Sequence, residues 1–431
     1  VRTNFSLPEN FIYPLRHAIS EGKISMQTID SRVADVLRVK FMMGLFDNPY
    51  KGDTKKLEKV VHCKEHQNVS MRAALESIVL LKNENNILPL SKSIKKVAVI
   101  GPNAAEVDNL ICRYGPANAP IKTVYQGIKD YLPDSEVRYA KGADIIDEYF
   151  PESELYDVPL NKTEETMIDE AVALAKESDV AIMVLGGNEK TVREEYSRTN
   201  LDLCGRQEKL LQAVYATGKL VILVMTDGRA ATINWAERYI PGIVHAWFPG
   251  EFMGDAIAKV IFGDYNPGGK LAVTFPRSVG QIPFAFPFKP GSDSKGFVRV
   301  TGSLYPFGYG LSYTTFDYSA LKIENPVIGT QGSVKLSCRV KNTGKIAGDE
   351  VVQLYLHDEV SSVTTYVKVL RGFERIHLQP GEEKVVDFVL TPQDMGLWNK
   401  DNHFIVEPGT FAVMVGSSSQ DIRLQGKFEV K

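Results

Sequence analysis

The stretch from Ser178 to Thr217 decides the fold and reads SDVAIMVLGGNEKTVREEYSRTNLDLCGRQEKLLQAVYAT. Its continuous apolar run, Val180 to Leu185, predicts a strand that is buried on both faces. Its last part predicts a helix from about Gln207, because apolar residues recur there at helical spacing. The loop between them opens with two glycines and carries three glutamates and two arginines. Ligands bind outside the carboxyl ends of parallel strands, so this loop has the position of a functional site; a solvated surface loop is the alternative.

Strands and helices alternate on both sides of that stretch. The predicted strands are 97–101, 137–142, 180–187, 220–225, 242–248 and 270–275, and the predicted helices are 164–177, 207–217 and 254–261. This alternation predicts a largely parallel sheet with helices on both faces. The segment VAVIGPNAA (97–105) lacks the GxGxxG spacing of a dinucleotide site, so we interpret Gly101 as a tight strand-to-helix turn.

The two ends of the chain differ from this central region. Residues 1–50 predict two helices, one stopped by Gly22 and one capped by Ser25, and they cannot bury a core of their own. From Tyr318 on, about seven short alternating strands with turn signals between them predict an immunoglobulin-like or fibronectin-like sandwich. We favour a bracing role for this sandwich over carbohydrate binding, since no exposed aromatic cluster is evident from the sequence.

The composition argues against several function classes. The 50 basic and 53 acidic residues are interspersed, their net charge is −3, and they give no sign of a nucleic-acid or membrane-surface partner. No apolar run approaches the ~20 residues that a membrane span needs. The four cysteines are far apart and have no histidine at metal-ligand spacing, so we expect buried thiols, no metal site and no cofactor.

Five motifs resemble one enzyme family. They are SIVLLKNENNILPL (77–90), GRQEKLLQAVYATGKLVILVMTDGR (205–229), AWFPGEFMGDAIAKVIFGDYNPGGKLAVTFPRSVGQIP (246–283), LYPFGYGLSYTTF (304–316) and VKNTGKIAGDEVVQLYLHD (340–358). The chain resembles the C-terminal part of glycoside hydrolase family three, of the three-domain β-glucosidase and β-xylosidase type. The resemblance implies a (β/α)8-like barrel, an α/β sandwich and a fibronectin type III-like domain. A barrel takes ~250 residues, so most of one is absent from this sequence.

The resemblance and the sequence patterns together predict five segments and one fold class. The segments are a barrel remnant (1–50), a linker with a lead-in helix (51–92), an α/β sandwich domain (93–290), a linking loop (291–317) and a fibronectin type III-like domain (318–431). The expected fold is therefore α/β: a largely parallel α/β sandwich, followed by an all-β sandwich and preceded by the closing helices of a TIM-like barrel.

The resemblance also implies a catalytic residue. Many members of the family take their acid/base from the sandwich domain, as a glutamate four residues before an arginine. That spacing selects Glu194 before Arg198 in EEYSR. Glu195 and Ser197 stand where a glycine and an aspartate are frequent in the family, so Glu195 stays open as the alternative. The family's nucleophile is an aspartate on a barrel strand, and no residue of this sequence can be given that role.

Further residues are candidates for substrate binding. Tyr196 and Arg198 are sugar contacts or loop-ordering residues, and Arg113 and Tyr114 lie in another loop at the same sheet edge. Trp235 and Trp247 are interpreted as packing residues. His245, inside an apolar strand, is interpreted as a buried histidine with satisfied hydrogen bonds rather than a ligand.

The leading functional hypothesis is the C-terminal portion of an exo-acting retaining β-glycosidase, in the first place a β-glucosidase that hydrolyses terminal non-reducing β-linked sugars. A β-xylosidase is the nearest alternative, and a non-catalytic carbohydrate-binding or structural protein is the alternative from another class. The expected partners are a β-linked oligosaccharide or glycoside and the missing barrel segment, with neither nucleic acid nor membrane; a homodimer stays open. We expect a periplasmic or secreted location rather than a cytoplasmic one, and no activity from this chain alone.

Overall fold

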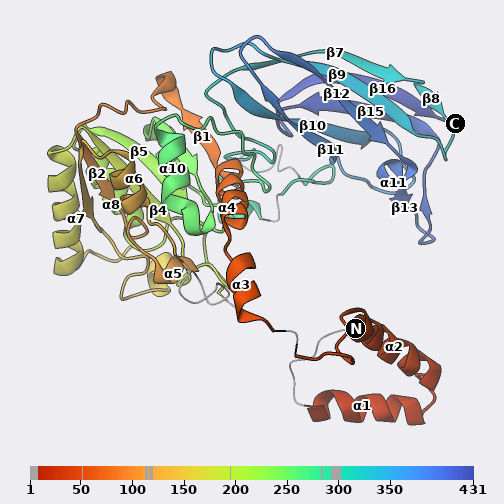
Figure 1. Ribbon diagram of the computed structural model, residues 1–431. Helices are drawn as coiled ribbons and strands as arrows, with labels where there is room; N and C mark the ends of the chain where they lie inside the picture. Colours follow the sequence, from red (N-terminus) through yellow and green to blue (C-terminus); the bar gives the residue numbers. More distant parts are fainter. Residues whose placement is uncertain are drawn as a thin grey trace. The chain divides into compact units, whose positions relative to one another are not determined.

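The computed structural model of the chain describes residues 8–50, 52–111, 115, 120–194, 196–282, 285–292 and 302–431 (Figure 1). The chain folds as two units, Val1–Gln67 and Asn68–Lys431. Within the described ranges, no helix combines the length and the apolar character of a membrane span.

The first unit is made of helices. They are α1 (Pro8–Ser20), α2 (Met26–Met42) and α3 (Thr54–Val60). Gly22 follows α1 with a φ of +70°, and the Ser25 hydroxyl caps α2 by accepting a hydrogen bond from the Thr28 N–H at 3.1 Å, as predicted. α2 buries none of its residues in the part of the chain that the structure describes. Large apolar side chains of α1 and α2 are 38% to 64% exposed: Phe11, Ile12, Val33, Val36, Leu37 and Phe41.

A six-stranded sheet forms the centre of the second unit. Its order is β1-β6-β5-β4-β2-β3, with β1 antiparallel to β6 and the other neighbours parallel. The strands are β1 (Val79–Asn83), β2 (Lys96–Ile100), β3 (Glu136–Ala140), β4 (Val180–Gly186), β5 (Leu220–Thr226) and β6 (Gly242–His245). The largely parallel sheet predicted from the alternating pattern is confirmed.

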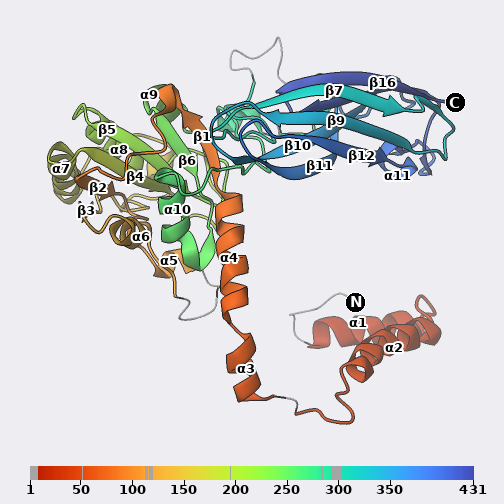
Figure 2. The same cartoon turned by 45° about the horizontal axis from the view of Figure 1, so that its top comes forward.

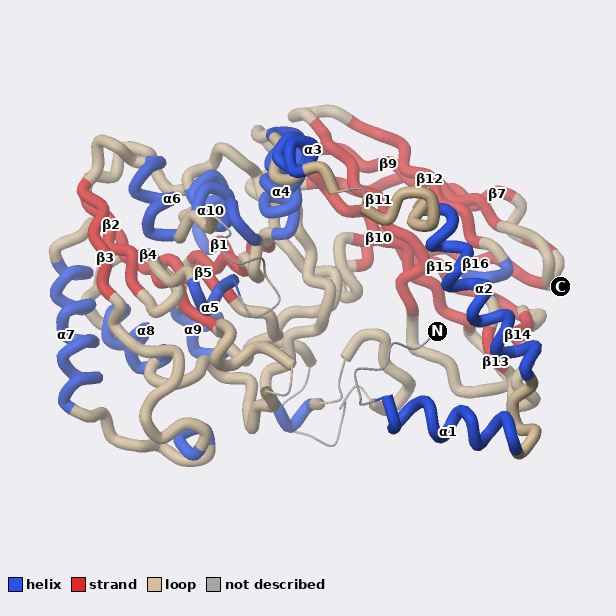
Figure 3. The backbone as a smooth tube through the Cα atoms, turned by 60° about the horizontal axis from the view of Figure 1, so that its bottom comes forward, coloured by secondary structure: helices blue, strands red, loops and turns tan. Residues whose placement is uncertain are grey.

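Helices cover both faces of this sheet, as Figure 3 shows. They are α4 (Lys64–Ser77), α5 (Asp108–Ile111), α6 (Val124–Tyr131), α7 (Lys162–Lys176), α8 (Gln207–Tyr215), α9 (Asn234–Tyr239) and α10 (Met253–Ile261). Successive residues of β4 point to opposite faces: Ala181, Met183 and Leu185 join the core under α7, α8 and α9, and their neighbours join the core under α4, α6 and α10. Every residue of β4 is buried for this reason.

Two parts of the sequence prediction need correction at the sheet edge. The segment 270–275 is not a strand; its Phe275 makes an isolated bridge to Tyr305. The place beside β6 belongs to β1, which comes from the segment 51–92 that we expected to hold only a linker and a lead-in helix. β1 takes that place because its first residues, Val79 and Leu80, are fully buried there, one on each face of the sheet.

The C-terminal part is a two-sheet β-sandwich, shown in blue in Figure 2. Its sheets have the strand orders β11-β10-β15-β16-β8 and β12-β9-β7, and a short β13-β14 hairpin lies beside them. The strands are β7 (Phe316–Glu324), β8 (Val327–Ile328), β9 (Val334–Asn342), β10 (Gly348–Asp358), β11 (Val369–Leu378), β12 (Glu383–Leu390), β13 (Leu397–Trp398), β14 (Phe404–Ile405), β15 (Gly409–Gly416) and β16 (Ile422–Val430), with the short helix α11 (Pro392–Met395). Alternate residues of β9 are buried, which is the pattern of a strand with one face on the core.

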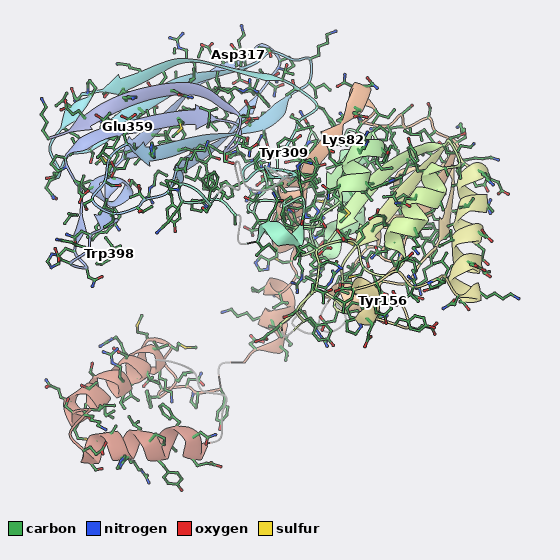
Figure 4. The ribbon with its side chains drawn as sticks, turned by 180° about the vertical axis from the view of Figure 1, so that it is seen from behind. Lys82, Tyr156, Tyr309, Asp317, Glu359 and Trp398 are labelled. Carbon is green, nitrogen blue, oxygen red and sulfur yellow. The ribbon has the colours of Figure 1, made fainter. Side chains whose placement is uncertain are left out.

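Buried polar contacts lie in and around the region where the sandwich meets the α/β part. Lys270 Nζ lies 3.3 Å from Glu350 Oε1, and these side chains are only 11% and 4% exposed. The Tyr318 hydroxyl donates a hydrogen bond to the same carboxylate at 2.9 Å. Tyr309, labelled in Figure 4, donates its hydroxyl to the Leu81 carbonyl of β1 at 3.1 Å. Of these contacts, the Lys270–Glu350 ion pair joins the α/β part to the sandwich, and it is consistent with the bracing role expected for the sandwich.

Candidate active site

The strand order creates a switch point between β2 and β4. The chain leaves β2 toward β3 on one side and later returns to β4 on the other, so the loops after β2 and β4 diverge there. Gly101 and Gly186 stand at these strand ends, and a Cβ at either would lie 2.1–2.2 Å from a carbonyl oxygen of the neighbouring strand. Gly101 is therefore required by a close strand approach. It is not the start of a tight strand-to-helix turn as predicted, because the next helix, α5, begins only at Asp108.

A buried asparagine connects the ends of three neighbouring strands. Asn103 Nδ2 donates to the Gly187 carbonyl and to Thr226 Oγ1, each at 2.9 Å. Asn103 Oδ1 accepts a hydrogen bond from Asn188 Nδ2 at 3.1 Å. The loop after β4 therefore starts from a fixed position. Asn103 was not among the site residues predicted from sequence, although it directly follows the GP of VAVIGPN.

Glu194 is exposed in the loop after β4. Its neighbours in the loop are held by their own contacts. Arg193 Nη1 donates to Glu189 Oε1 at 2.9 Å, and the Arg193 guanidinium carbon lies 3.7 Å from the centre of the Tyr196 ring. This arrangement presents a carboxyl group at the carboxyl-end edge of the sheet, where ligands of such folds bind.

Arg198 points into the protein. Its Nε donates to Glu154 Oε1, and its Nη2 donates to the Asp202 carbonyl at 2.9 Å. The Glu154 carboxylate also accepts the Thr199 N–H at 3.1 Å. These contacts favour loop ordering over sugar contact for Arg198. The substrate-binding roles given to Arg198 and Tyr196 stay predictions.

Some candidate residues lie outside the described residues. They are Arg113, Tyr114 and Glu195.

A buried aspartate lies under the same loop. Asp227 follows β5 and is 6% exposed, and its Oδ1 accepts a hydrogen bond from the Arg229 N–H at 3.0 Å. Burial raises the pKa of the Asp227 carboxyl to about 6, while the Arg229 N–H and the positive charges of Arg198 and Arg229 oppose the rise. Asp227 was not among the site residues predicted from sequence, where its only signal is the TDGR turn that follows an apolar strand.

The aromatic and histidine predictions have mixed outcomes. Trp235 and Trp247 pack against the core, as predicted. His245 is fully buried between Trp247 and Phe275, as expected. Neither of its ring nitrogens has a hydrogen-bond partner in the described part of the chain, so the prediction that its hydrogen bonds are satisfied is wrong. Burial lowers the pKa of His245 to about 3, which keeps the ring neutral.

The cysteine and metal expectations can be compared with the described residues. Cys204 and Cys338 are buried free thiols, Cys63 is partly exposed, and Cys112 lies outside the described residues. Across those ranges, no group of three or more His, Cys, Asp or Glu side chains is arranged to hold a metal ion. A polar groove of about 480 Å³ lies next to the loop and is lined by Glu154, Tyr156, Arg198 and Lys209 among others.

Comparison with known proteins identifies the class of these two domains. Residues 78–313 match the Glycosyl hydrolase family 3 C-terminal domain, and residues 350–419 match a Fibronectin type III-like domain. The chain belongs to glycoside hydrolase family 3.

Individual relatives agree with this assignment. The chain is 41% identical to a β-xylosidase of Formosa agariphila over 94% of this chain and 56% of the relative, and 38% identical to a periplasmic β-glucosidase of Salmonella typhimurium over 96% and 57%. A solved β-glucosidase of Erythrobacter marinus superposes with a TM-score of 0.87 at 36% identity, over 97% of this chain and 57% of that one. The chain therefore spans little more than half the length of these relatives.

Proposed function

We propose that this chain is the C-terminal portion of an exo-acting retaining β-glycosidase that hydrolyses terminal non-reducing β-linked sugars, with a β-glucosidase as the main assignment. The observation that carries the proposal is the position of Glu194, exposed in a loop at the carboxyl end of β4 and beside the β2–β4 switch point. The names of the relatives, which include β-glucosidases and β-xylosidases, support the reaction class.

In this proposal Glu194 is the general acid/base. A retaining glycosidase needs two carboxyl groups about 5–5.5 Å apart, one that attacks the anomeric carbon and one that protonates the leaving oxygen and later activates water. Glu194 takes the second role. The anchored contacts of Arg193 and Arg198 on either side limit how far its backbone can move, and a fixed backbone lowers the entropy lost on reaching the productive geometry.

A barrel segment supplies the other carboxyl group. This chain covers only 56% and 57% of these two relatives, which leaves room for a further domain in them. The exposed apolar faces of α1 and α2 support the same proposal, because exposed apolar patches of this kind mark interaction surfaces. These helices then pack on barrel elements, and the nucleophile comes from that barrel.

The binding partner is a β-linked oligosaccharide or glycoside. A mutant β-glucosidase of Listeria innocua, solved in complex with laminaribiose, superposes on this chain with a TM-score of 0.84 at 29% identity, which supports a β-linked glucan as the substrate type. The periplasmic relative supports a periplasmic or secreted location.

The test compares the chain alone with the chain joined to a barrel. The 431-residue chain should not hydrolyse nitrophenyl β-glucoside, because in this proposal the nucleophile comes from the barrel segment. Joined at its N-terminus to the part of the Salmonella β-glucosidase that this chain does not match, it should turn the substrate over, and Glu194→Ala should abolish most of that turnover. The barrel segment alone is the control. Robust hydrolysis by the 431-residue chain alone would contradict the proposal.

A β-xylosidase is the second candidate. It is favoured by the 41% identity to a relative named β-xylosidase. The ratio of kcat/KM for nitrophenyl β-xyloside and nitrophenyl β-glucoside distinguishes the two in the protein carrying its own barrel. A ratio above one would replace the glucosidase assignment with the xylosidase assignment while leaving Glu194 in its role.

A further inference from the structure

Arg229 connects the turn after β5 to the loop that carries Glu194. Its Nη2 donates a hydrogen bond to the Tyr196 carbonyl at 2.5 Å. Tyr196 lies only two residues beyond Glu194 in the sequence. The contact therefore joins two segments that are 33 residues apart, and it does so close to the proposed acid/base.

The β5 end of this connection is rigid. The Arg229 N–H donates to the buried Asp227 carboxyl at 3.0 Å, which fixes the backbone of the turn. Gly228 is also packed closely, since a Cβ there would lie 2.7 Å from Val192 Cγ1 and 2.9 Å from Phe248 Cε2. Because this turn is held in place, the Arg229 guanidinium can fix the position of the loop that it contacts.

The loop end is held on a second side. The Arg193 guanidinium covers the Tyr196 ring at 3.7 Å and is itself paired with Glu189 at 2.9 Å. Arg193 and Tyr196 are thus restrained by a contact within the loop and by a contact to the sheet. Arg229 provides the contact to the sheet.

The hydrogen bonding of Arg229 is incomplete in a way that stability alone does not explain. Its Nε is buried and has no hydrogen-bond partner among the described residues. A buried, unsatisfied donor opposes folding. Such departures are expected where a side chain is placed for function.

We propose that Arg229 is a positioning residue for Glu194, and that it sets the place of the acid/base by holding the Tyr196 carbonyl. This inference rests on the proposed function for Glu194. Arg229 acts through the loop backbone in this proposal and does not touch the substrate. Its loss should therefore affect proton transfer to the leaving group more than substrate binding.

The first experiment uses the 431-residue chain and needs no activity. A glutamate-specific protease cleaves after Glu194, so its cleavage rate there reports how often the loop opens. Arg229→Met should be cleaved about 10-fold faster than wild type, as expected for the loss of one hydrogen bond to a charged donor. Arg229→Lys, which keeps one charged donor, should fall between the two. Cleavage of Arg229→Met at the wild-type rate would overturn the proposal.

A matched control excludes a general effect of losing an arginine. Arg138 is exposed on the edge strand β3 and pairs with Glu177 at 2.6 Å. Arg138→Met should leave cleavage after Glu194 unchanged. Equal acceleration by Arg138→Met and Arg229→Met would assign the effect to general loosening of the fold and would overturn the proposal.

The second experiment uses the chain joined to the barrel segment. Arg229→Met should lower kcat by about 10²-fold for cellobiose, the loss expected for a displacement of about 1 Å, with KM nearly unchanged. A dinitrophenyl β-glucoside, whose leaving group needs no proton, should lose far less. Equal losses for both substrates would overturn the positioning role. An inactive joined wild type would count against the proposed function only, because the protease result does not depend on it.

Discussion

The side chains of Arg198 and Glu154 form an ion pair that is almost fully withdrawn from solvent. They are only 6% and 5% exposed, and Arg198 Nε donates directly to Glu154 Oε1. The pair ties the downstream end of the loop that carries Glu194 to the 3-10 helix Glu152–Glu154, 44 residues earlier in the chain. Arg198 was a candidate sugar contact from sequence. Its side chain instead donates hydrogen bonds to Glu154 and to the Asp202 carbonyl, both within the protein.

Breaking this pair from one side should be costly. Glu154→Ala leaves the Arg198 guanidinium buried without its carboxylate and should lower the free energy of unfolding by about 3–5 kcal/mol. Urea unfolding measures the loss. The double variant Glu154→Leu with Arg198→Met should regain most of it, because neither charge then remains buried. A Glu154→Ala chain as stable as wild type would show that the pair contributes little.

Asp227 should make stability fall as the pH rises. Its folded-state pKa of about 6 lies above the ordinary value of 3.8, so the folded state holds the proton more tightly than the unfolded state. The contribution is complete below pH 3.8 and is lost as the pH rises through about 6. The total contribution to the free energy of unfolding is about 3 kcal/mol, because a pKa difference of one corresponds to about 1.36 kcal/mol. Arg198 and Arg229 are the charged groups that oppose it.

Replacing Asp227 tests this pH dependence. Asp227→Asn keeps an oxygen that can accept the Arg229 N–H but does not titrate. Its unfolding free energy should change less between pH 4 and 6.5 than that of wild type. Identical slopes for the two proteins over this range would rule out Asp227 as the source.

His245 should act in the opposite direction. Its pKa is about 3 in the folded state and 6.5 ordinarily, so its contribution is present above pH 6.5 and is lost as the pH falls toward 3. His245→Leu should match wild type near pH 7, because the ring nitrogens make no hydrogen bonds in the described residues. At pH 4 the variant should be the more stable protein by about 3 kcal/mol.

An exposed histidine provides the control for that measurement. His403 is exposed at the surface of the β-sandwich, and His403→Gln is the matched variant at a histidine outside the core. Thermal melts from pH 4 to pH 7 compare the three proteins. A His245→Leu chain that loses stability at acid pH as steeply as wild type would refute the assignment.

Local pattern was enough to predict much of the fold. The unbroken apolar run of β4 signals burial on both faces, and the Ser25 cap and the alternating strands of the sandwich are equally local signals. The position of β1 could not be predicted in this way. An apolar run does not tell which sheet edge it will occupy, and here the run pairs antiparallel with β6, far along the chain.

The site was less predictable, because its contacts are distant in sequence. The family resemblance marks Glu194 and Arg198, but the partner of Arg198 is Glu154, in a segment without a motif. Asp227 resembles an ordinary turn residue until packing buries it. The network around Asn103 likewise depends on three strand ends that only the folded sheet brings together.

The central claim is that Glu194 is the acid/base, and azide rescue tests it most directly. In the chain joined to its barrel, Glu194→Ala should lower kcat for cellobiose by about 10²–10⁴-fold and should affect a dinitrophenyl β-glucoside far less. Added azide should restore turnover of the activated substrate and yield a β-glycosyl azide, because the anion replaces the water that the base no longer activates. Glu189→Ala and Glu195→Ala are the matched controls and should give no azide product. Rescue of Glu195→Ala with a Glu194→Ala enzyme near wild type would move the role by one residue, and rescue of neither would place the acid/base outside this loop.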